Sequence, residues 1–423
     1  MLKVSKSFQA SIPTWRNHPT VTVLGWCVSL AVYCSASGIG QTWEATRTPI
    51  KSWLRVASSA DGTKLAATAR GGFVYTSTDS GATWRTNNLP AYGWASIASS
   101  ADGNKLVTVA RQQLGHLSAV YASTNAGALW FDLQAPSTNW GYIASSADGT
   151  KLVATAQWGY IFISTNAGAA WSQTASPTEP WQTVACSADG NIILAAGFAP
   201  DYSPSRVAVS TNAGSTWTVA SFAFNPTSVA CSAGGDRMMV TTAFGGVYFS
   251  TNFGVLWNLT SLRNNNNDYW SGLACSADGT RWAAGISHSY NDPTFLDRMF
   301  LSSDSGISWV AANAPTTNWN SIASSADGSK WVAVVGDLFG QIGPICTRQS
   351  VPTPELSITA TGTNLVLSWV MPSRPFSLQQ SSDPISGNWV DPQVPPTLNY
   401  SNLRYKVTAP ASAAAAFYRL VSE

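Results

Sequence analysis

Residues 56–84 read VASSADGTKLAATARGGFVYTSTDSGATW, and this stretch decides the fold because both of its motifs recur along the chain. The first motif, Ile/Val-Ala-Ser-Ser-Ala-Asp-Gly, returns at intervals of 41, 46, 41, 45, 44 and 49 residues. Six copies carry Asp before the last Gly and one carries Gly there: Asp61, Asp102, Asp148, Asp189, Gly234, Asp278 and Asp327. Self-similarity at a regular period indicates a repeat architecture.

A second motif, Ser-x-Asp/Asn-x-Gly-x-x-Trp, follows each of the first six copies. Ala-Asp-Gly between apolar stretches predicts a tight hairpin, because Asp caps its own turn and Gly adopts positive φ. In the second motif Ser and Asp/Asn satisfy turn amides, and Trp covers the hairpin with an apolar face. The short flanking segments, such as 64–69 and 73–78, favour strands. Each repeat therefore predicts four antiparallel strands in about 44 residues, which is typical of a propeller blade.

The second motif resembles the Asp-box, or BNR repeat, of β-propellers that include sialidases, xyloglucanases, sortilin-type receptors and a photosystem II assembly factor. The resemblance covers residues 38–350 and implies that the box is a structural element away from the active site, so it identifies no activity. The residues that match the box are Asp79, Gly81, Trp84, Asn125, Gly127, Trp130, Asn166, Gly168, Trp171, Asn212, Gly214, Trp217, Asn252, Gly254, Trp257, Asp304, Gly306 and Trp309.

The N-terminal part of the repeat region predicts how the ring closes. Gly40-Gln-Thr-Trp43 is the second half of a box, and Gly40 lies 21 residues before Asp61, as Gly81 does before Asp102. The seventh repeat, 319–350, has no box of its own. We therefore expect an all-β, seven-bladed propeller in which residues 42–47 pair antiparallel with 342–348 and complete the last blade, with Trp43 buried.

Three further segments complete the predicted organisation. Residues 1–37 have the features of a secretory signal: Lys3, Lys6 and Arg16 precede the apolar run 21–33, which is followed by the small residues 35–37. We expect a secreted or cell-surface monomer with no membrane span after signal removal. The linker 351–354 leads into 355–423, which resembles the small fibronectin-like sandwiches of secreted bacterial proteins.

Composition excludes several classes of function. The 23 Lys+Arg and 21 Asp+Glu give a net charge of +2 without basic runs, which argues against nucleic acid as a partner. No CxxC or HExxH motif is present, so we expect neither a metal nor a cofactor. Cys186, Cys231 and Cys275 share one repeat position and, with Cys346, are expected to be buried thiols without disulfides.

The propeller face opposite the Ala-Asp-Gly turns is the expected binding face. Three loop insertions fall there, at 111–118, 197–205 and 286–298, and insertions on one face of a repeat protein often mark its binding face. Six repeats begin with Trp, which either packs between blades or lines the mouth of the propeller and stacks on sugars. The candidate ligand-binding residues are Trp53, Trp94, Trp140, Trp181, Trp270, Trp319, Arg70, Arg111, Arg206 and Arg298.

Catalysis would require carboxylates on the same face. The candidates that are not committed to turns are Glu179, Asp201, Asp268, Asp292, Asp297 and Asp337. Glycoside hydrolysis needs two carboxyls roughly 5–9.5 Å apart, and an acid pair from Asp268, Asp292, Asp297 and Asp337 is one way to supply them. A sialidase would also need an arginine triad and a Tyr–Glu pair, and Glu is nearly missing from the propeller.

The sequence leaves three functions open. The first is a secreted non-enzymatic propeller that binds a glycan or a surface or protein partner through a Trp-lined, loop-rich face. The alternative is a polysaccharide or sialoside hydrolase using loop carboxylates. The third is an assembly factor similar to the photosystem II one, for which Arg70, Arg111 and Arg206 would form the patch that engages a protein.

Overall fold

The computed structural model describes most of the chain after the leader. The described residues are 42–87, 89–90, 93–111, 118–198, 204–262, 268–289, 299–336, 341–350, 355–382, 388–410 and 416–422. Every regular element among them is a β-strand, and none of them forms a helix long and apolar enough to cross a membrane. The secretory signal predicted for 1–37 lies outside the described residues.

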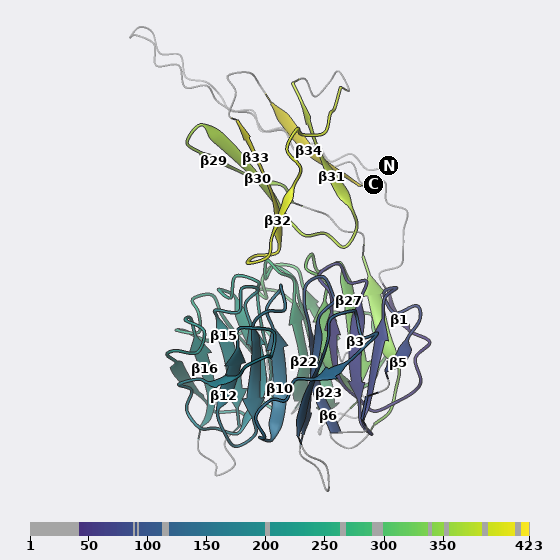
Figure 1. The fold of residues 1–423 in the computed structure, drawn as a ribbon, viewed down its shortest axis with the longest axis vertical. Coiled ribbons are helices and arrows are strands. Elements are labelled where there is room, and N and C mark those ends of the chain that lie inside the picture. Colours follow the sequence, from purple (N-terminus) through teal and green to yellow (C-terminus); the bar gives the residue numbers. More distant parts are fainter. Residues whose placement is uncertain are drawn as a thin grey trace.

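Six antiparallel sheets follow one another along the chain, each of four consecutive strands (Figure 1). The first three comprise β2 (Trp53–Ser58), β3 (Leu65–Ala69), β4 (Phe73–Ser77), β5 (Arg85–Asn87); β6 (Gly93–Ser99), β7 (Leu106–Arg111), β8 (Ala119–Ser123), β9 (Phe131–Asp132); and β10 (Trp140–Ser145), β11 (Leu152–Ala156), β12 (Ile161–Ser164), β13 (Ser172–Gln173). The next three comprise β14 (Trp181–Cys186), β15 (Ile193–Gly197), β16 (Ser205–Ser210), β17 (Thr218–Phe222); β18 (Pro226–Cys231), β19 (Met238–Thr242), β20 (Gly246–Ser250), β21 (Asn258–Leu259); and β22 (Asp268–Cys275), β23 (Trp282–Ser289), β24 (Met299–Ser302), β25 (Val310–Ala311).

A seventh sheet joins the two ends of this region. It consists of β26 (Trp319–Ser324), β27 (Lys330–Val335), β28 (Ile345–Gln349) and the N-terminal strand β1 (Trp43–Ala45). β1 pairs antiparallel with β28, with Trp43 opposite Arg348 and Ala45 opposite Cys346. The predicted pairing of 42–47 with 342–348 is therefore confirmed for 43–45 with 346–348, and Trp43 is 6% exposed. Gly40 lies outside the described residues.

The sheets stand around an axis, as in a β-propeller. The first strands of successive sheets contact one another, from β2 round to β26 and back to β2. Each sheet stays open, and backbone bonds between sheets close the ring. One alanine of each turn motif donates its N–H to the carbonyl of the next sheet's alanine at 2.7–2.9 Å, in the order Ala60, Ala101, Ala147, Ala188, Ala233, Ala277, Ala326 and back to Ala60.

The Ala-Asp-Gly turns form as their sequence predicts. Ser59 Oγ donates to Asp61 Oδ1 at 2.5 Å, and the same carboxylate accepts the Thr63 N–H at 2.9 Å. Gly62 has φ +68° and leaves room for the Lys330 side chain, which would lie 2.8 Å from an added Cβ. Lys105 likewise crosses to the next sheet, where its Nζ donates to the Asp148 carbonyl at 2.8 Å. These basic side chains link neighbouring sheets, a role that the repeat pattern did not predict.

The six box turns share their Ser and Asp/Asn hydrogen bonds to turn amides, and four of them add a bond from the Trp indole, as the first box illustrates. Ser77 Oγ accepts the Gly81 N–H at 2.9 Å, Asp79 Oδ1 accepts the Thr83 N–H at 2.9 Å, and Trp84 Nε1 donates to the Gly81 carbonyl at 3.1 Å. Ser80 donates its N–H to the Thr63 carbonyl, so both turn types lie on one face, as expected. We call it the turn face and the opposite one the loop face. The residue before each box Gly also has positive φ (Ser80, 57°), which the sequence did not predict.

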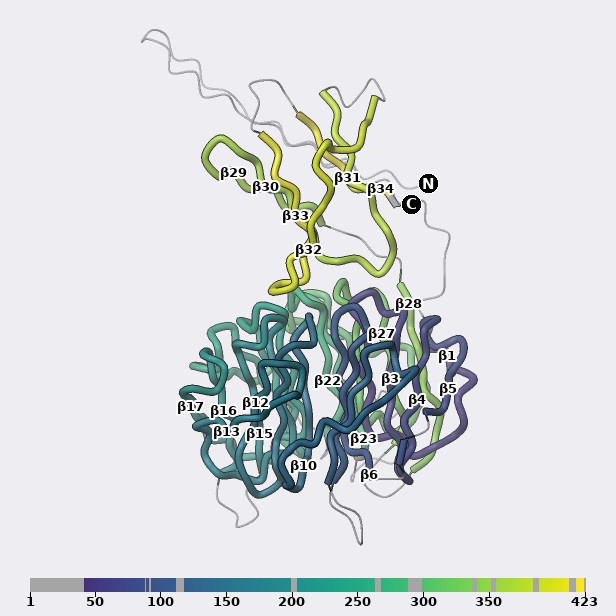
Figure 2. Tube along the Cα trace, in the orientation of Figure 1, coloured from purple at the N-terminus to yellow at the C-terminus, as the bar shows by residue number. Residues whose placement is uncertain are grey.

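The C-terminal residues form a separate pair of sheets above the turn face (Figure 2). The strands are β29 (Ser357–Thr361), β30 (Asn364–Val370), β31 (Phe376–Ser381), β32 (Thr397–Asn399), β33 (Arg404–Pro410) and β34 (Phe417–Ser422). One sheet has the order β29-β30-β33-β32 and the other is β31-β34. Both contribute to one core, which contains Leu367, Trp369, Leu378, Val407 and Tyr418. Val390 adds one isolated antiparallel bridge to Gln380 of β31.

Candidate binding site on the loop face

The six repeat tryptophans lie in the core and form no binding surface. Trp53, Trp94, Trp140, Trp181, Trp270 and Trp319 are 0–2% exposed. Trp53 packs edge-on against Tyr75 with ring centroids 5.0 Å apart, and its Nε1 donates to the Gly343 carbonyl at 2.9 Å. The prediction that these six residues line a ligand-binding mouth is therefore wrong, because each side chain fills the wedge between neighbouring sheets.

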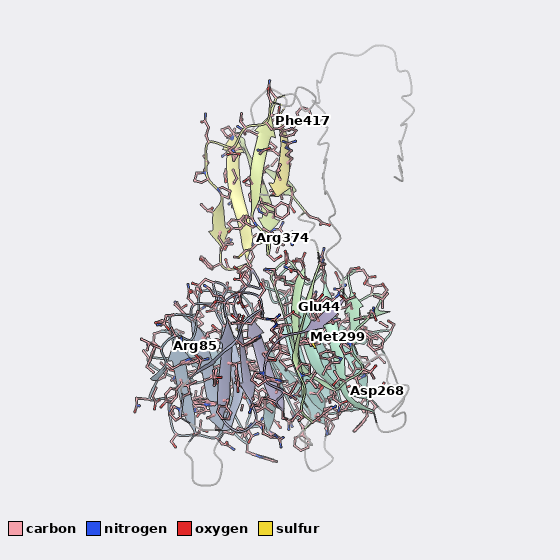
Figure 3. All side chains as sticks on the ribbon, turned by 90° about the vertical axis from the view of Figure 1, so that its right-hand side faces the viewer. Glu44, Arg85, Asp268, Met299, Arg374 and Phe417 are labelled. Atoms are coloured by element: carbon pink, nitrogen blue, oxygen red, sulfur yellow. The ribbon has the colours of Figure 1, made fainter. Side chains whose placement is uncertain are left out.

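The candidate carboxylates do not assemble into an acid pair among the described residues. Asp201, Asp292, Asp297 and Asp337 lie outside the described residues. Asp268 is 3% exposed at the start of β22, toward the end of the propeller away from the C-terminal sheets (Figure 3). Glu179 forms an ion pair with Arg206, Oε1 to Nη1, at 3.0 Å. The structure thus places Glu179 beside a cation rather than beside a second acid.

The four candidate arginines separate into different environments. Arg206 is the exposed partner of Glu179, Arg70 is exposed after β3, and Arg298 lies outside the described residues. Arg111, at the end of β7, enters a cluster with Arg55 of β2 and Tyr142 of β10. Sequence reasoning missed Arg55 and Tyr142. Their only signal is position: both stand two residues after the repeat tryptophan, where other repeats carry Ser, Thr or Gly.

The cluster draws on three successive sheets. Arg55 Nη2 and Arg111 Nη2 each donate to the Tyr142 hydroxyl at 3.2 Å. The two guanidinium carbons also lie over the tyrosine ring, 4.9 and 5.4 Å from its centroid, so both cations contact its π-face. Because Arg55 and Tyr142 belong to the first and third sheets, the side chains meet across the first strand of the second sheet. All three are half-buried.

The electrostatics of the cluster are strongly positive. Burial by itself raises the pKa of Tyr142, but the charges of Arg55 and Arg111 and their hydrogen bonds outweigh it and hold that pKa below 10.0. No carboxylate among the described residues forms an ion pair with either guanidinium. Arg111 Nε is buried and has no hydrogen-bond acceptor among the described residues. Buried donors are normally satisfied, so this arrangement suits an incoming anion.

The part of the chain that the structure describes contains no cluster of metal-ligating side chains. Among the described residues, no group of three His, Cys, Asp or Glu is placed to hold a metal ion. Cys346 is buried as expected, whereas Cys186, Cys231 and Cys275 are half-buried free thiols that face a cavity on the propeller axis. Their interpretation as buried packing residues therefore needs correction.

Comparison with known proteins defines the fold. No family model matches the chain, and no curated protein matches it. Among solved structures, one described as YCF48 bound to D1 peptide is 14% identical, with a TM-score of 0.54 over 77% of this chain and 100% of that one. YCF48 from Cyanidioschyzon merolae is 14% identical, with a TM-score of 0.55 over 73% and 99%. The fold is a β-propeller.

A glycoside hydrolase is also among the structural neighbours of this β-propeller. The Niastella koreensis GH74 enzyme is 22% identical, with a TM-score of 0.50 over 72% of this chain and 44% of that one. Similarity at these levels of identity establishes the shared fold alone. A function must therefore be argued from the side chains of the propeller itself.

Proposed function

We propose that this chain is a secreted, non-enzymatic Asp-box propeller of seven blades with a C-terminal β-sandwich, and that its loop face binds an anionic segment of a protein partner. Residues 1–37 direct export in this proposal. The observation that carries it is the pair Arg55 and Arg111, which converge on Tyr142 without a carboxylate partner among the described residues. Guanidinium groups bind carboxylates through paired, charge-assisted hydrogen bonds.

A protein partner fits the site better than a glycan does. Sugar recognition on a propeller mouth would use exposed aromatic faces, and the six repeat tryptophans are buried. The one aromatic ring of the cluster, Tyr142, is already covered by two cations. The YCF48 structure with a bound D1 peptide has the same fold, which supports peptide binding as a kind of function for this scaffold.

Fluorescence anisotropy with labelled oligoglutamate tests this proposal, and an oligoglutamine peptide of equal length serves as the uncharged comparison. Each hydrogen bond to a charged group contributes about 1.5–3 kcal/mol, so the double variant R55Q/R111Q should bind oligoglutamate at least about tenfold more weakly. R85Q, on the exposed outer strand β5, is the matched control for removing positive charge. Equal affinity of R55Q/R111Q and wild type, or equal binding of both peptides, would overturn the proposal.

A hydrolase is the second candidate, favoured by the GH74 neighbour and by Asp268, one of the acid candidates from the sequence. Incubation with xyloglucan and measurement of new reducing ends tests it directly. The binding proposal expects no release from wild type. Release that disappears in D268N would replace it with the hydrolase function.

A further inference from the structure

A cavity lies on the propeller axis at the turn face. Its volume is about 180 Å³, and its walls are Ser, Ala and Cys side chains from the turn motifs of all seven sheets. The three thiols come from successive first strands: Cys186 ends β14, Cys231 ends β18 and Cys275 ends β22. One residue from outside the propeller completes the lining, Leu403, which lies between β32 and β33 of the C-terminal sheets.

In the part of the chain that the structure describes, the C-terminal sheets contact the propeller mainly through turns and loops rather than strands. Val370, Met371 and Leu403 pack against the ring of turn alanines. The Leu403 carbonyl accepts the Met371 N–H at 2.8 Å, which holds the two contact segments together. Ser373 donates its N–H to Asp327 Oδ2 at 2.8 Å, and its hydroxyl is hydrogen-bonded to that of Ser329. No strand of the C-terminal sheets pairs with a propeller strand among the described residues.

The thiols differ from the serines that occupy the same position in the other four sheets. Ser58 Oγ donates to the neighbouring Ser59 carbonyl at 2.9 Å, and Ser99, Ser145 and Ser324 repeat this bond. Cys275 instead points across to the Cys231 carbonyl, 3.2 Å away. Burial raises the pKa of Cys186 to about 12 and raises those of Cys231 and Cys275 as well. The thiols therefore react slowly while the cavity stays covered.

We propose that the C-terminal sheets form a movable cover of the axial cavity, with Leu403 as its contact residue over the mouth. Small interfaces between domains permit relative motion. In this interface, Leu403 of the C-terminal sheets contacts the ring of alanines, and Ser373 contacts the seventh sheet. When the cover is docked, the cavity and its three thiols are closed to large molecules. When it lifts, the Ser, Ala and Cys side chains of the cavity become accessible from the turn face.

Thiol labelling of the full chain with a bulky polyethylene-glycol maleimide tests the cover, with mass spectrometry assigning each modified cysteine. Leu403 has φ +53°, so L403G removes the side chain at a backbone position that glycine adopts without strain. Losing the apolar contact of one Leu should accelerate labelling of Cys186, Cys231 and Cys275 at least about tenfold. L398A, on β32 of the same sheet, is the control and should label like wild type. The rate at Cys346, which is buried and outside the cavity, measures global unfolding and is subtracted.

A second variant tests the motion itself. The Ser329 and Ser373 hydroxyls are in direct contact, so S329C/S373C should form a disulfide that locks the cover. The oxidised form should label the three thiols more slowly than wild type, and reduction should restore the rate. Wild-type rates in L403G, rates in the locked form equal to those in the reduced form, or failure of the two introduced cysteines to crosslink would each overturn the proposal.

Discussion

Replacing Trp43 with Ala tests the strand that completes the seventh sheet. Trp43 is 6% exposed and belongs to a core cluster with Met299, Trp319 and Trp331. Its ring lies 5.7 Å from that of Trp319, centroid to centroid. Truncating a buried Trp to Ala typically costs about 3–5 kcal/mol. The indole N–H of Trp43 has no acceptor among the described residues. The desolvation cost of this unpaired donor therefore offsets part of the free energy gained by burying the ring. We therefore expect a loss near the lower end, about 3 kcal/mol.

Guanidinium unfolding followed by far-UV circular dichroism measures this loss. W158A is the matched control, because Trp158 is 62% exposed and its truncation should change stability by no more than about 0.5 kcal/mol. W43F keeps an aromatic ring and removes the unpaired N–H, so it should unfold close to wild type. Deleting 38–48 removes the whole strand and leaves a sheet edge unpaired, so that variant should aggregate or melt far lower. Equal midpoints for W43A and W158A would refute the argument that β1 anchors the ring.

Three further predictions follow from the turns and the cluster. The box hydrogen bonds lower the pKa of Asp304 to about 2. The ionised carboxylate therefore stabilises the fold above the unfolded pKa near 4, and this stabilisation is lost as the pH falls toward 2. Between about pH 4 and pH 2, the melting temperature of D304N should fall less than that of wild type. The absorbance titration of wild type should contain a tyrosine below pH 10 that is missing in Y142F and shifted upward in R55Q, and an unchanged titration in Y142F would contradict the assignment. Gly103 and Gly71 both have positive φ, but an added Cβ meets a lysine side chain at 2.7 Å only at Gly103, so G103A should lower the melting temperature more than G71A.

The two ends of the propeller differ in charge: the Arg55–Arg111–Tyr142 cluster lies toward the loop face, and the axial cavity lies at the turn face. Arg55 and Arg111 bring uncompensated positive charge toward the loop face. The axial cavity at the turn face is lined by small, uncharged side chains and by Leu403. A partner that approaches the loop face meets charge, whereas one that approaches the turn face must first displace the C-terminal sheets. The two proposals therefore fail or succeed independently in their own assays.

The sequence by itself determined the strands, the turns and the closing strand. Turn chemistry is local: the Asp61 carboxylate, its neighbouring hydroxyls and Gly62 fall within a few residues of one another, so the motif specifies the hairpin. The closing strand follows from the repeat interval, which predicted that residues 42–47 pair with 342–348, and the structure adds the register that places Trp43 opposite Arg348.

Only the tertiary structure decided which side chains can act. The repeat tryptophans are the same in sequence whether they line a mouth or fill a wedge, and packing between neighbouring sheets buries them. Arg55 and Tyr142 are 87 residues apart and meet because the ring places the first and third sheets on either side of the second. Leu403 reaches the alanine ring only through the docking of the C-terminal sheets. Each of these contacts joins distant parts of the chain, and the local repeat pattern carries no information about such pairs.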